Sequence, residues 1–265
     1  MESIPFYKYQ GAGNDFIMID QRQHQWILRT DQVLVEQLCD RRFGIGADGL
    51  ILLQNHSGFD FEMIYFNSDG REGSMCGNGG RCTVAFAHHL SAIGESCHFL
   101  AVDGPHGAKV THPEWVELKM IDVTHVERGS DFYYLNTGSP HYIAFVENVD
   151  QIEVVQAGRA IRYNERFKAE GTNVNFTQVT DQGLKVVTYE RGVEDETLAC
   201  GTGVTAAALA YHLQSNGQHG VFEVPIKVKG GAMAIRFTAT EQGFEEVWLC
   251  GPAKMVFKGQ FEVNK

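Results

Sequence analysis

The chain has 265 residues, which is long enough for one large or two modest domains, each with a buried core. With 43% apolar and 21% charged residues, its composition is that of a globular protein and excludes a disordered or fibrous chain. Its formal charge is −11, and no basic run is longer than a pair such as Arg41-Arg42, so the charge argues against nucleic acid as a partner.

Short apolar or alternating runs along the chain predict strands. They lie at residues 15–20, 50–54, 59–66, 116–120, 142–146, 174–179, 184–189, 226–228, 232–238 and 246–249. Helical spacing is confined to residues 31–41, 76–90, 154–162 and 203–213. Many strands with few helices predict the α+β class.

Exported, membrane-bound and disulfide-rich proteins are argued against by three features. No apolar stretch approaches the roughly 18 residues of a membrane span, and residues 1–5 lead into no hydrophobic signal core. Six cysteines in so long a chain are too few for a disulfide framework. We therefore expect a cytoplasmic protein with free thiols and no membrane partner.

An internal repeat relates the two halves of the chain. The matched pairs, at offsets of 124 or 125, are Gly13 with Gly138, Gly46 with Gly171, Tyr65 with Tyr189, and Cys76 with Cys200. Each glycine comes shortly before a predicted strand, and each cysteine comes before a predicted helix. The repeat predicts two similar domains, residues 1–122 and 123–253, with residues 254–265 a candidate addition to the first.

Each half carries the pattern Cys-Gly-Xaa-Gly at the expected start of a helix, at residues 76–79 and 200–203. A cysteine there faces unpaired backbone N–H groups and the positive end of the helix dipole, which favour the thiolate. The following glycine lets a ligand approach the same amides, which can hold a carboxylate. Two such thiols indicate inversion at carbon, where one face loses a proton and the other gains one.

Other interpretations of the cysteines and glycines fit less well. Cys39, Cys82, Cys97 and Cys250 lie in apolar or helical runs and are expected in the core. The group Cys76, Cys82, His88 and His89 lacks zinc spacing, so no metal site is expected. Residues 44–49 fit the dinucleotide fingerprint, but the helix is expected before them and the strand after them, which is the reverse order.

Nine motifs in order along the chain carry a family resemblance. They are Gly11-Ala12-Gly13-Asn14-Asp15-Phe16, Gly44-Ile45-Gly46-Ala47-Asp48-Gly49, Phe66-Asn67-Ser68-Asp69-Gly70, Met75-Cys76-Gly77-Asn78-Gly79-Gly80-Arg81-Cys82, Gly138-Ser139-Pro140-His141, Gly171-Thr172-Asn173-Val174, Glu190-Arg191-Gly192, Ala199-Cys200-Gly201-Thr202-Gly203 and Gly251-Pro252-Ala253. With them the chain resembles the diaminopimelate epimerase family from end to end.

The resemblance implies two pseudo-symmetric domains, each a mostly antiparallel sheet wrapped around a central helix, with the active site in the cleft between them. It implies epimerisation of LL- and meso-diaminopimelate without metal or pyridoxal phosphate, in lysine and peptidoglycan precursor biosynthesis. A homodimer is among these expectations.

The resemblance also assigns site residues. It implies that Cys76 and Cys200 are the acid–base pair, with His141 and Glu190 as further catalytic groups. The implied substrate-binding residues are Asn14, Asn67, Gly77, Asn78, Ser139, Asn173, Glu190, Arg191, Gly201 and Thr202. Arg191 suits a carboxylate and Glu190 suits an ammonium. Ser139 stands where many members carry asparagine, so a substrate contact there is expected to be shorter, indirect or absent.

Residue type alone leaves alternatives open. The three asparagines 14, 67 and 173 also suit plain turns, and Glu190-Arg191 also suits a solvated surface pair. A proline or hydroxyproline racemase would use two Cys-Gly sites as well, but the polar set around them suits a substrate with a second charged end. A thiol redox or binding protein would use the cysteines as a switch, and it would give no exchange at an amino-acid α-carbon in D2O.

Overall fold

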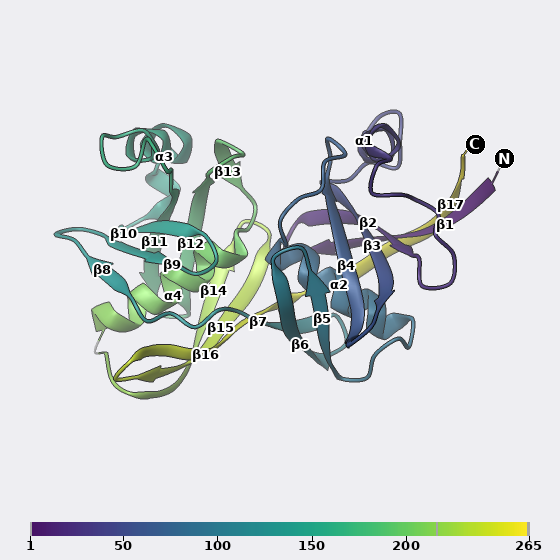
Figure 1. Ribbon diagram of the computed structural model, residues 1–265. Helices are drawn as coiled ribbons and strands as arrows, with labels where there is room; N and C mark the ends of the chain where they lie inside the picture. Colours follow the sequence, from purple (N-terminus) through teal and green to yellow (C-terminus); the bar gives the residue numbers. More distant parts are fainter. Residues whose placement is uncertain (1, 216, 264–265) are drawn as a thin grey trace. The chain divides into compact units, whose positions relative to one another are not determined.

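The computed structural model describes residues 2–215 and 217–263 (Figure 1). The chain forms two compact units. Unit 1 runs to Leu118 and takes up the chain again at Gly251, and unit 2 is Lys119–Cys250.

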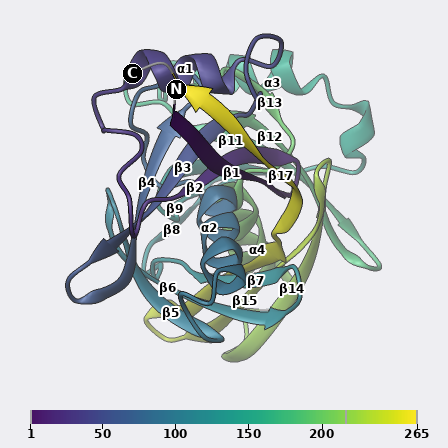
Figure 2. The same cartoon turned by 90° about the vertical axis from the view of Figure 1, so that its right-hand side faces the viewer.

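Unit 1 is a strongly bent sheet around one helix. Its elements are β1 (Glu2–Gly11), β2 (Asn14–Asp20), α1 (Gln32–Cys39), β3 (Gly49–His56), β4 (Phe59–Asn67), α2 (Gly77–His89), β5 (Ser96–Ala101), β6 (Gly104–His112), β7 (Trp115–Lys119) and β17 (Lys254–Val263). The pairs β2–β3 and β4–β5 are parallel, and β17–β1, β1–β2, β3–β4, β5–β6 and β6–β7 are antiparallel. Helix α2 contacts β1, β2, β3, β4, β6 and β17 and lies in the middle of the sheet in Figure 2.

Unit 2 repeats this order. Its elements are β8 (Val126–Arg128), β9 (Tyr133–Asn136), β10 (Pro140–Phe145), η1 (Val149–Gln151), α3 (Val154–Arg162), β11 (Asn173–Thr180), β12 (Gly183–Glu190), β13 (Asp195–Thr197), α4 (Gly201–Ser215), β14 (Gly220–Val228), β15 (Gly231–Thr240) and β16 (Gly243–Pro252). Again the strand before α3, β10, is parallel to β11 after it, and β12 is parallel to β14, which follows α4. The predicted α+β fold with two similar halves is confirmed.

The sequence explains why two helices are central and two are peripheral. Helix α4 is buried on almost every side and consists mainly of alanine, glycine and other small residues, so strands can approach it closely. Helix α3 instead has an apolar stripe and arginines in its last turn. It packs on the other face of its sheet, in a core that contains Val174, Phe176 and Tyr189. Helix α1 contributes Val35 and Leu38 to the matching core of unit 1.

Several strands carry no pattern that predicts them: β1, β5, β6, β9, β17 and the short β8 and β13. β17 shows why. It alternates partly exposed with exposed residues and buries none fully, so its pattern carries little signal. Its ladder with β1 nevertheless extends from Glu2↔Val263 to Gln10↔Lys254. Pairing with a strand more than 240 residues away therefore determines this element, and no local pattern reports it.

The repeat predicted from glycines is borne out by backbone geometry, but one of its matches is wrong. Gly13, Gly138, Gly46 and Gly171 all have positive φ, of 93°, 107°, 81° and 76°. The two matched tyrosines, however, lie on opposite faces of their sheets. Tyr65 contacts Phe16 on the α2 side, whereas Tyr189 packs against Gly158 of α3. A match by sequence offset alone cannot detect a one-residue slip, which turns a strand residue to the other face.

The four cysteines expected in the core are there. Cys39, Cys82, Cys97 and Cys250 are each at most 3% exposed. Burial raises the pKa of the Cys39, Cys82 and Cys97 thiols to about 12. These three are therefore thiols at neutral pH and poor nucleophiles.

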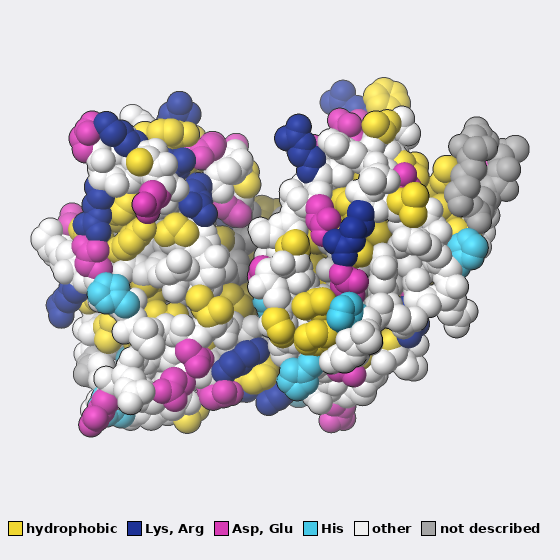
Figure 3. Space-filling view, in the orientation of Figure 1, with side chains coloured by type: hydrophobic (Ala, Val, Ile, Leu, Met, Phe, Trp, Pro, Cys, Tyr) yellow, Lys and Arg dark blue, Asp and Glu magenta, His cyan; other side chains and the backbone are white. Residues whose placement is uncertain are grey.

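Two features concern the surface and the membrane. No helix among the described residues has both the length and the apolarity needed to cross a bilayer. Acidic and basic side chains are interspersed over the face shown in Figure 3.

Gly46 and Gly58 have similar φ but different surroundings. Alanine substitutions at the two positions therefore show how far close contacts restrict the turn before β3. Gly46 has φ 81°, and a Cβ there would stand 2.9 Å from the Arg41 Cα. Gly58 has φ 92° and nothing within 4 Å. We expect Gly58→Ala to cost about 1 kcal/mol of unfolding free energy, the left-handed penalty alone. Gly46→Ala should cost at least about 1 kcal/mol more, because the Arg41 backbone must also move. Urea unfolding measures both, and equal losses would contradict the close approach.

Candidate active site

Cys76 lies at the N-terminal end of α2, as predicted. It is the N-cap residue in extended conformation, and its carbonyl oxygen accepts a hydrogen bond of 2.7 Å from the Gly80 N–H. Cys76 is partly exposed, unlike the four core cysteines. The first N–H groups of a helix have no partner within the helix, so Gly77 and Asn78 present backbone donors beside this thiol.

Two predicted asparagines meet beside Cys76. Asn78 Nδ2 donates to Asn14 Oδ1 at 2.5 Å, and Asn14 Nδ2 donates to Asp48 Oδ2 at 2.9 Å. On its other side, Asn78 Oδ1 accepts from Arg81 Nη2 at 2.9 Å. Asn78 and Arg81 are buried. The asparagines are therefore held by a chain of hydrogen bonds that runs from α2 to the residue before β3.

A cluster of charges fixes the strand that carries Asn14. Lys8 Nζ lies 2.8 Å from an Asp15 oxygen, and Arg41 reaches both Asp15 and Asp48 at 2.6 and 2.7 Å. Burial raises the pKa of Asp15, but hydrogen bonds from Arg41 and Lys8 outweigh it and lower this pKa to about 2. Asp15 is thus ionised at neutral pH and holds the glycine turn before β2 against the turn before β3.

Asn67 stands apart from this chain. It ends β4, is exposed, and lies opposite Gly49 in the sheet ladder. Its Nδ2 approaches Gly73 so closely that a Cβ there would stand 2.8 Å away. Its side chain is therefore available at the surface of unit 1.

Cys200 occupies the matching place in unit 2. Its carbonyl oxygen accepts from the Val204 N–H at 2.9 Å in the first turn of α4, and its side chain is buried. The Cys200 Sγ lies 3.5 Å from the Thr202 Oγ1. The same hydroxyl lies 2.9 Å from His141 Nε2. The structure thus brings together three of the predicted residues.

His141 is a neutral, buried imidazole. It is 0% exposed, and burial, with a smaller contribution from the positive charge of Arg191, lowers its pKa to about 3. Its Nδ1 lies 3.0 Å from Asn175 Nδ2. A histidine in these surroundings stays uncharged at neutral pH, and the Thr202 hydroxyl connects it to Cys200.

Three more predicted residues of unit 2 form a second group. Asn173 Nδ2 donates to Ser139 Oγ at 2.9 Å, and Asn173 Oδ1 accepts from the Arg191 backbone N–H at 2.9 Å. The Arg191 side chain is exposed, and its Nη1 donates to the Glu170 carbonyl oxygen at 2.9 Å. The serine that departs from the family pattern therefore accepts from Asn173 inside the unit.

Glu190 ends β12 and is partly buried. Desolvation by burial raises the pKa of its carboxyl, and the Thr197 hydroxyl opposes this rise. A carboxyl whose pKa is raised in this way exchanges protons more readily near neutral pH than an exposed one.

Two polar residues at this site were not predicted from the sequence. Asn175 is 0% exposed and Thr188 is 4% exposed, and Thr188 Oγ1 donates to Asn175 Oδ1 at 2.8 Å. Asn175 follows Asn173 by two residues, so both face the same side of β11. A second asparagine on the buried face of a predicted strand was the available signal.

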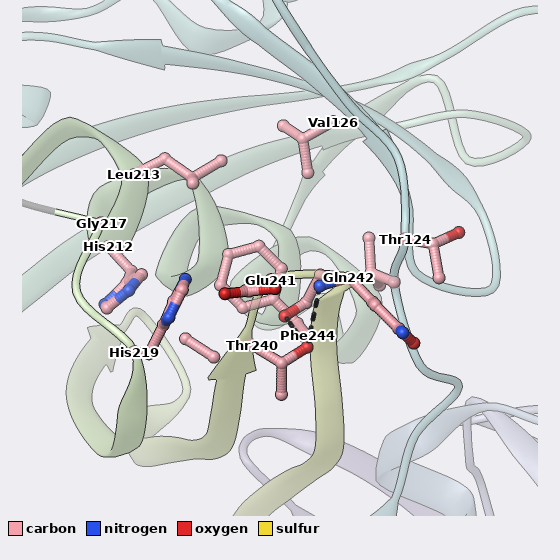
Figure 4. Close-up of a pocket in the computed structure, with 13 residues that line it drawn as sticks. Thr124, Val126, His212, Leu213, Gly217, His219, Thr240, Glu241, Gln242 and Phe244 are labelled. Atoms are coloured by element: carbon pink, nitrogen blue, oxygen red, sulfur yellow. Dashed lines mark hydrogen bonds between the residues drawn. The ribbon is translucent and has the colours of Figure 1, made fainter.

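A pocket of about 270 Å3 lies elsewhere in unit 2, near the end of α4. In Figure 4, His212 and His219 lie beside each other at this pocket, with Phe244 nearby. His212 is buried, and its ring packs against those of Phe222 and Phe237 at 4.4 and 5.4 Å. None of the residues that line the pocket was predicted as a site residue, and His212 is a packing residue.

Comparison with known proteins gives consistent matches over the whole chain. A family model described as "Diaminopimelate epimerase" matches residues 6–126 and 133–256. A protein of that name from Flavobacterium psychrophilum is 46% identical over 96% of this chain and 99% of its own length. Another from Chlorobaculum tepidum is 45% identical over 94% of this chain and 98% of its own.

Solved structures show the fold. A protein described as a phenazine biosynthesis protein of the PhzF family, from Bacillus anthracis, gives a TM-score of 0.76 at 12% identity, covering 99% of this chain and 100% of that one. A hydroxyproline epimerase from Agrobacterium vitis gives 0.68 at 12% identity, covering 98% and 91%. At such identities the likeness concerns architecture alone.

The buried neutral histidine should make stability depend on pH. The ordinary pKa of histidine is 6.5, and that of His141 in the folded protein is about 3. At pH values between these two, His141 binds a proton when unfolded but not when folded. The unfolding free energy should therefore fall, as pH falls, by about 1.4 kcal/mol per pH unit within this window. His141→Gln keeps one acceptor and one donor but does not titrate, so it should lose stability less steeply.

Urea unfolding of both proteins at pH 7, 6 and 5 measures the difference. Both proteins contain the other titrating groups, including Asp15 and His212. The contributions of these groups cancel in the difference between the two proteins. Parallel losses in the two proteins would contradict a neutral His141.

Proposed function

The chain belongs to the diaminopimelate epimerase family and is an isomerase, and from this premise we propose that it interconverts LL- and meso-2,6-diaminopimelate by a two-base mechanism. Such an activity serves lysine and peptidoglycan precursor biosynthesis. The observation that supports the mechanism is the pair of cysteines, Cys76 and Cys200, each at the N-terminal end of a central helix in its own unit.

The proposed step transfers one proton to the protein and one from it. A thiolate removes the α-proton, and the electron pair of the C–H bond passes into the adjacent carboxylate. The thiol of the other cysteine then donates its proton to the opposite face of the carbon. The former thiolate is now a thiol and the former thiol a thiolate, so the reverse reaction starts from exchanged roles.

The negative charge that develops on the reacting carboxylate needs donors already in place. Backbone N–H groups of Gly77 and Asn78 in α2, and of Gly201 and Thr202 in α4, are suited to this because helix N-termini bind anions. Because two thiols supply both proton transfers, the proposal uses neither a metal nor pyridoxal phosphate. A reducing cytoplasm suits it, since both thiols must stay unoxidised.

The distal end of the substrate is proposed to bind at Arg191 and Glu190 of unit 2, and Asn14, Asn67 and Asn173 are proposed as further substrate-binding residues. The exposed guanidinium of Arg191 can grip a carboxylate with two hydrogen bonds, and its backbone is held by Asn173. Glu190 can accept from an ammonium or take part in proton transfer. Ser139 acts through Asn173, to which it is hydrogen bonded.

Replacing either proposed base tests the mechanism. We expect Cys76→Ala and Cys200→Ala each to abolish epimerisation of diaminopimelate with the fold intact, because inversion needs a proton carrier on both faces. Loss of α-hydrogen in D2O, followed by NMR with diaminopimelate and proline in parallel, measures this.

Cys97→Ala is the matched control, because Cys97 is buried in β5. It should reduce stability by about 1 kcal/mol or more and leave the turnover rate unchanged. Substantial epimerisation by either of the first two variants would refute the two-base mechanism. Exchange with proline rather than diaminopimelate would favour a racemase.

The guanidinium fork should determine substrate choice. Arg191→Lys keeps the charge but loses bidentate binding, so we expect kcat/KM for diaminopimelate to fall. The fall should correspond to a loss of about 2 kcal/mol or more of transition-state stabilisation. Arg166→Lys, at an exposed arginine of unit 2 paired with Glu127, should leave kcat/KM unchanged. An unaltered value for Arg191→Lys would make Arg191 a surface residue without a part in binding.

A further inference from the structure

A chain of polar side chains ends at Cys200. It runs from Thr188 Oγ1 to Asn175 Oδ1, from Asn175 Nδ2 to His141 Nδ1, and from His141 Nε2 to Thr202 Oγ1, over 2.8, 3.0 and 2.9 Å. The Thr202 hydroxyl is in turn 3.5 Å from the Cys200 sulfur. Thr188, Asn175 and His141 are buried, so water does not compete for these hydrogen bonds.

The direction of the hydrogen bonds follows from one backbone group. Asn175 Nδ2 lies 3.2 Å from the Tyr142 carbonyl oxygen, which can only accept. The amide nitrogen is therefore on this side, where it also meets His141 Nδ1. That ring nitrogen must accept, so in the neutral imidazole the hydrogen is on Nε2 and is donated to Thr202 Oγ1.

The tautomer of His141 affects the sulfur of Cys200. Since Thr202 Oγ1 accepts from His141, its own hydrogen is free to point at Cys200 Sγ. A hydrogen bond donated to sulfur stabilises the thiolate relative to the thiol. The positive charge of Arg191 also disfavours protonation of His141 and lowers its pKa.

Unit 1 provides an internal comparison. In the sheet ladders, Phe16 pairs with Gly49 as His141 pairs with Asn173. Two residues further along β3, Ile51 pairs with Tyr65, just as Asn175 pairs with Thr188 in unit 2.

Both sets face a glycine in the first turn of their central helix. A Cβ on Gly79 would stand 3.2 Å from Ile51 Cδ1, and a Cβ on Gly203 would overlap Asn175 Oδ1. The places of His141, Asn175 and Thr188 are thus held in unit 1 by Phe16, Ile51 and Tyr65. The fold accepts apolar and aromatic side chains at these places, so packing alone does not require the polar chain.

We propose that Asn175 is a positioning residue for Cys200: it fixes the tautomer of His141, and His141 turns the Thr202 hydroxyl toward the Cys200 sulfur. The reactivity of Cys200 then depends on a residue that is linked to the sulfur through His141 and Thr202. The inference deepens the proposed function, in which Cys200 is one of the two bases.

The rate of alkylation by iodoacetamide reports the thiolate form of a cysteine directly. Trypsin releases Cys76 in residues 72–81 and Cys200 in residues 192–227, each as the single cysteine of its peptide, so mass spectrometry follows both in one sample. Thr202→Val should slow Cys200 alkylation at pH 7 by about threefold to tenfold and move its pH profile upward. Thr202→Ser keeps the hydroxyl and should restore the wild-type rate.

Asn175→Leu, which imitates the aliphatic residue of unit 1, should slow Cys200 to the same extent as Thr202→Val. The double variant should be no slower than either single one, because both break the same chain. The matched control is Thr177→Val, on the same face of β11, where the buried hydroxyl has no hydrogen-bond partner among the described residues. It should leave Cys200 at the wild-type rate, and Cys76 should be unchanged throughout.

Two results would overturn the proposal. One is a wild-type rate for Cys200 in Asn175→Leu while Thr202→Val is slow, which would show that Thr202 acts without the chain. The other is equal slowing of Cys76 and Cys200, which would show a general loss of structure. Alkylation does not require turnover, so a chain that failed to epimerise diaminopimelate would refute the proposed function and leave this result standing.

A second measurement needs no substitution at Asn175. The 15N spectrum of histidine-labelled protein, with the His141 signals identified by their loss in His141→Gln, should show Nε2 protonated and Nδ1 unprotonated from pH 8 to pH 5. The opposite tautomer, or a charged ring in this range, would also overturn the proposal.

Discussion

A helix surrounded by strands has one end that the strands cannot satisfy, because its first N–H groups have no partner within the helix. In both units the residue at that end is a cysteine followed by glycine, at Cys76 and Cys200. Burying these N–H groups without partners would cost free energy, and the same groups can bind an anion. The rest of each unit, from the glycine turns to the parallel strand pairs, brings further polar groups to this end.

The two units support their cysteines by different physical means. Around Cys76, the asparagines are tied to ionised groups, and Asp15 stays charged because Lys8 and Arg41 outweigh its desolvation. Beside Cys200, a buried and uncharged His141 passes on a hydrogen bond. The two units therefore share a backbone fold, but the charges around their cysteines differ.

Sequence reasoning predicted the parts that depend on local pattern. Small-residue helices after Cys-Gly, and glycines at positive φ such as Gly13 and Gly138, leave a signal in the chain itself. Strand β17 could not be found in this way, since its partner β1 is at the other end of the sequence. Asn175 was missed for a related reason: its role arises from the ladder that sets it opposite Thr188, and a single sequence does not state this register.

The chemistry proposed for the chain explains why two halves of one repeat can differ. A racemase interconverts mirror images, whose free energies in solution are equal. The distal centre of diaminopimelate stays L during the proposed reaction, so the two epimers are diastereomers and the two bases meet unequal partners. A thiolate supported by ionised neighbours on one face and by a neutral relay on the other is compatible with that inequality, because each base needs to match only the epimer it deprotonates.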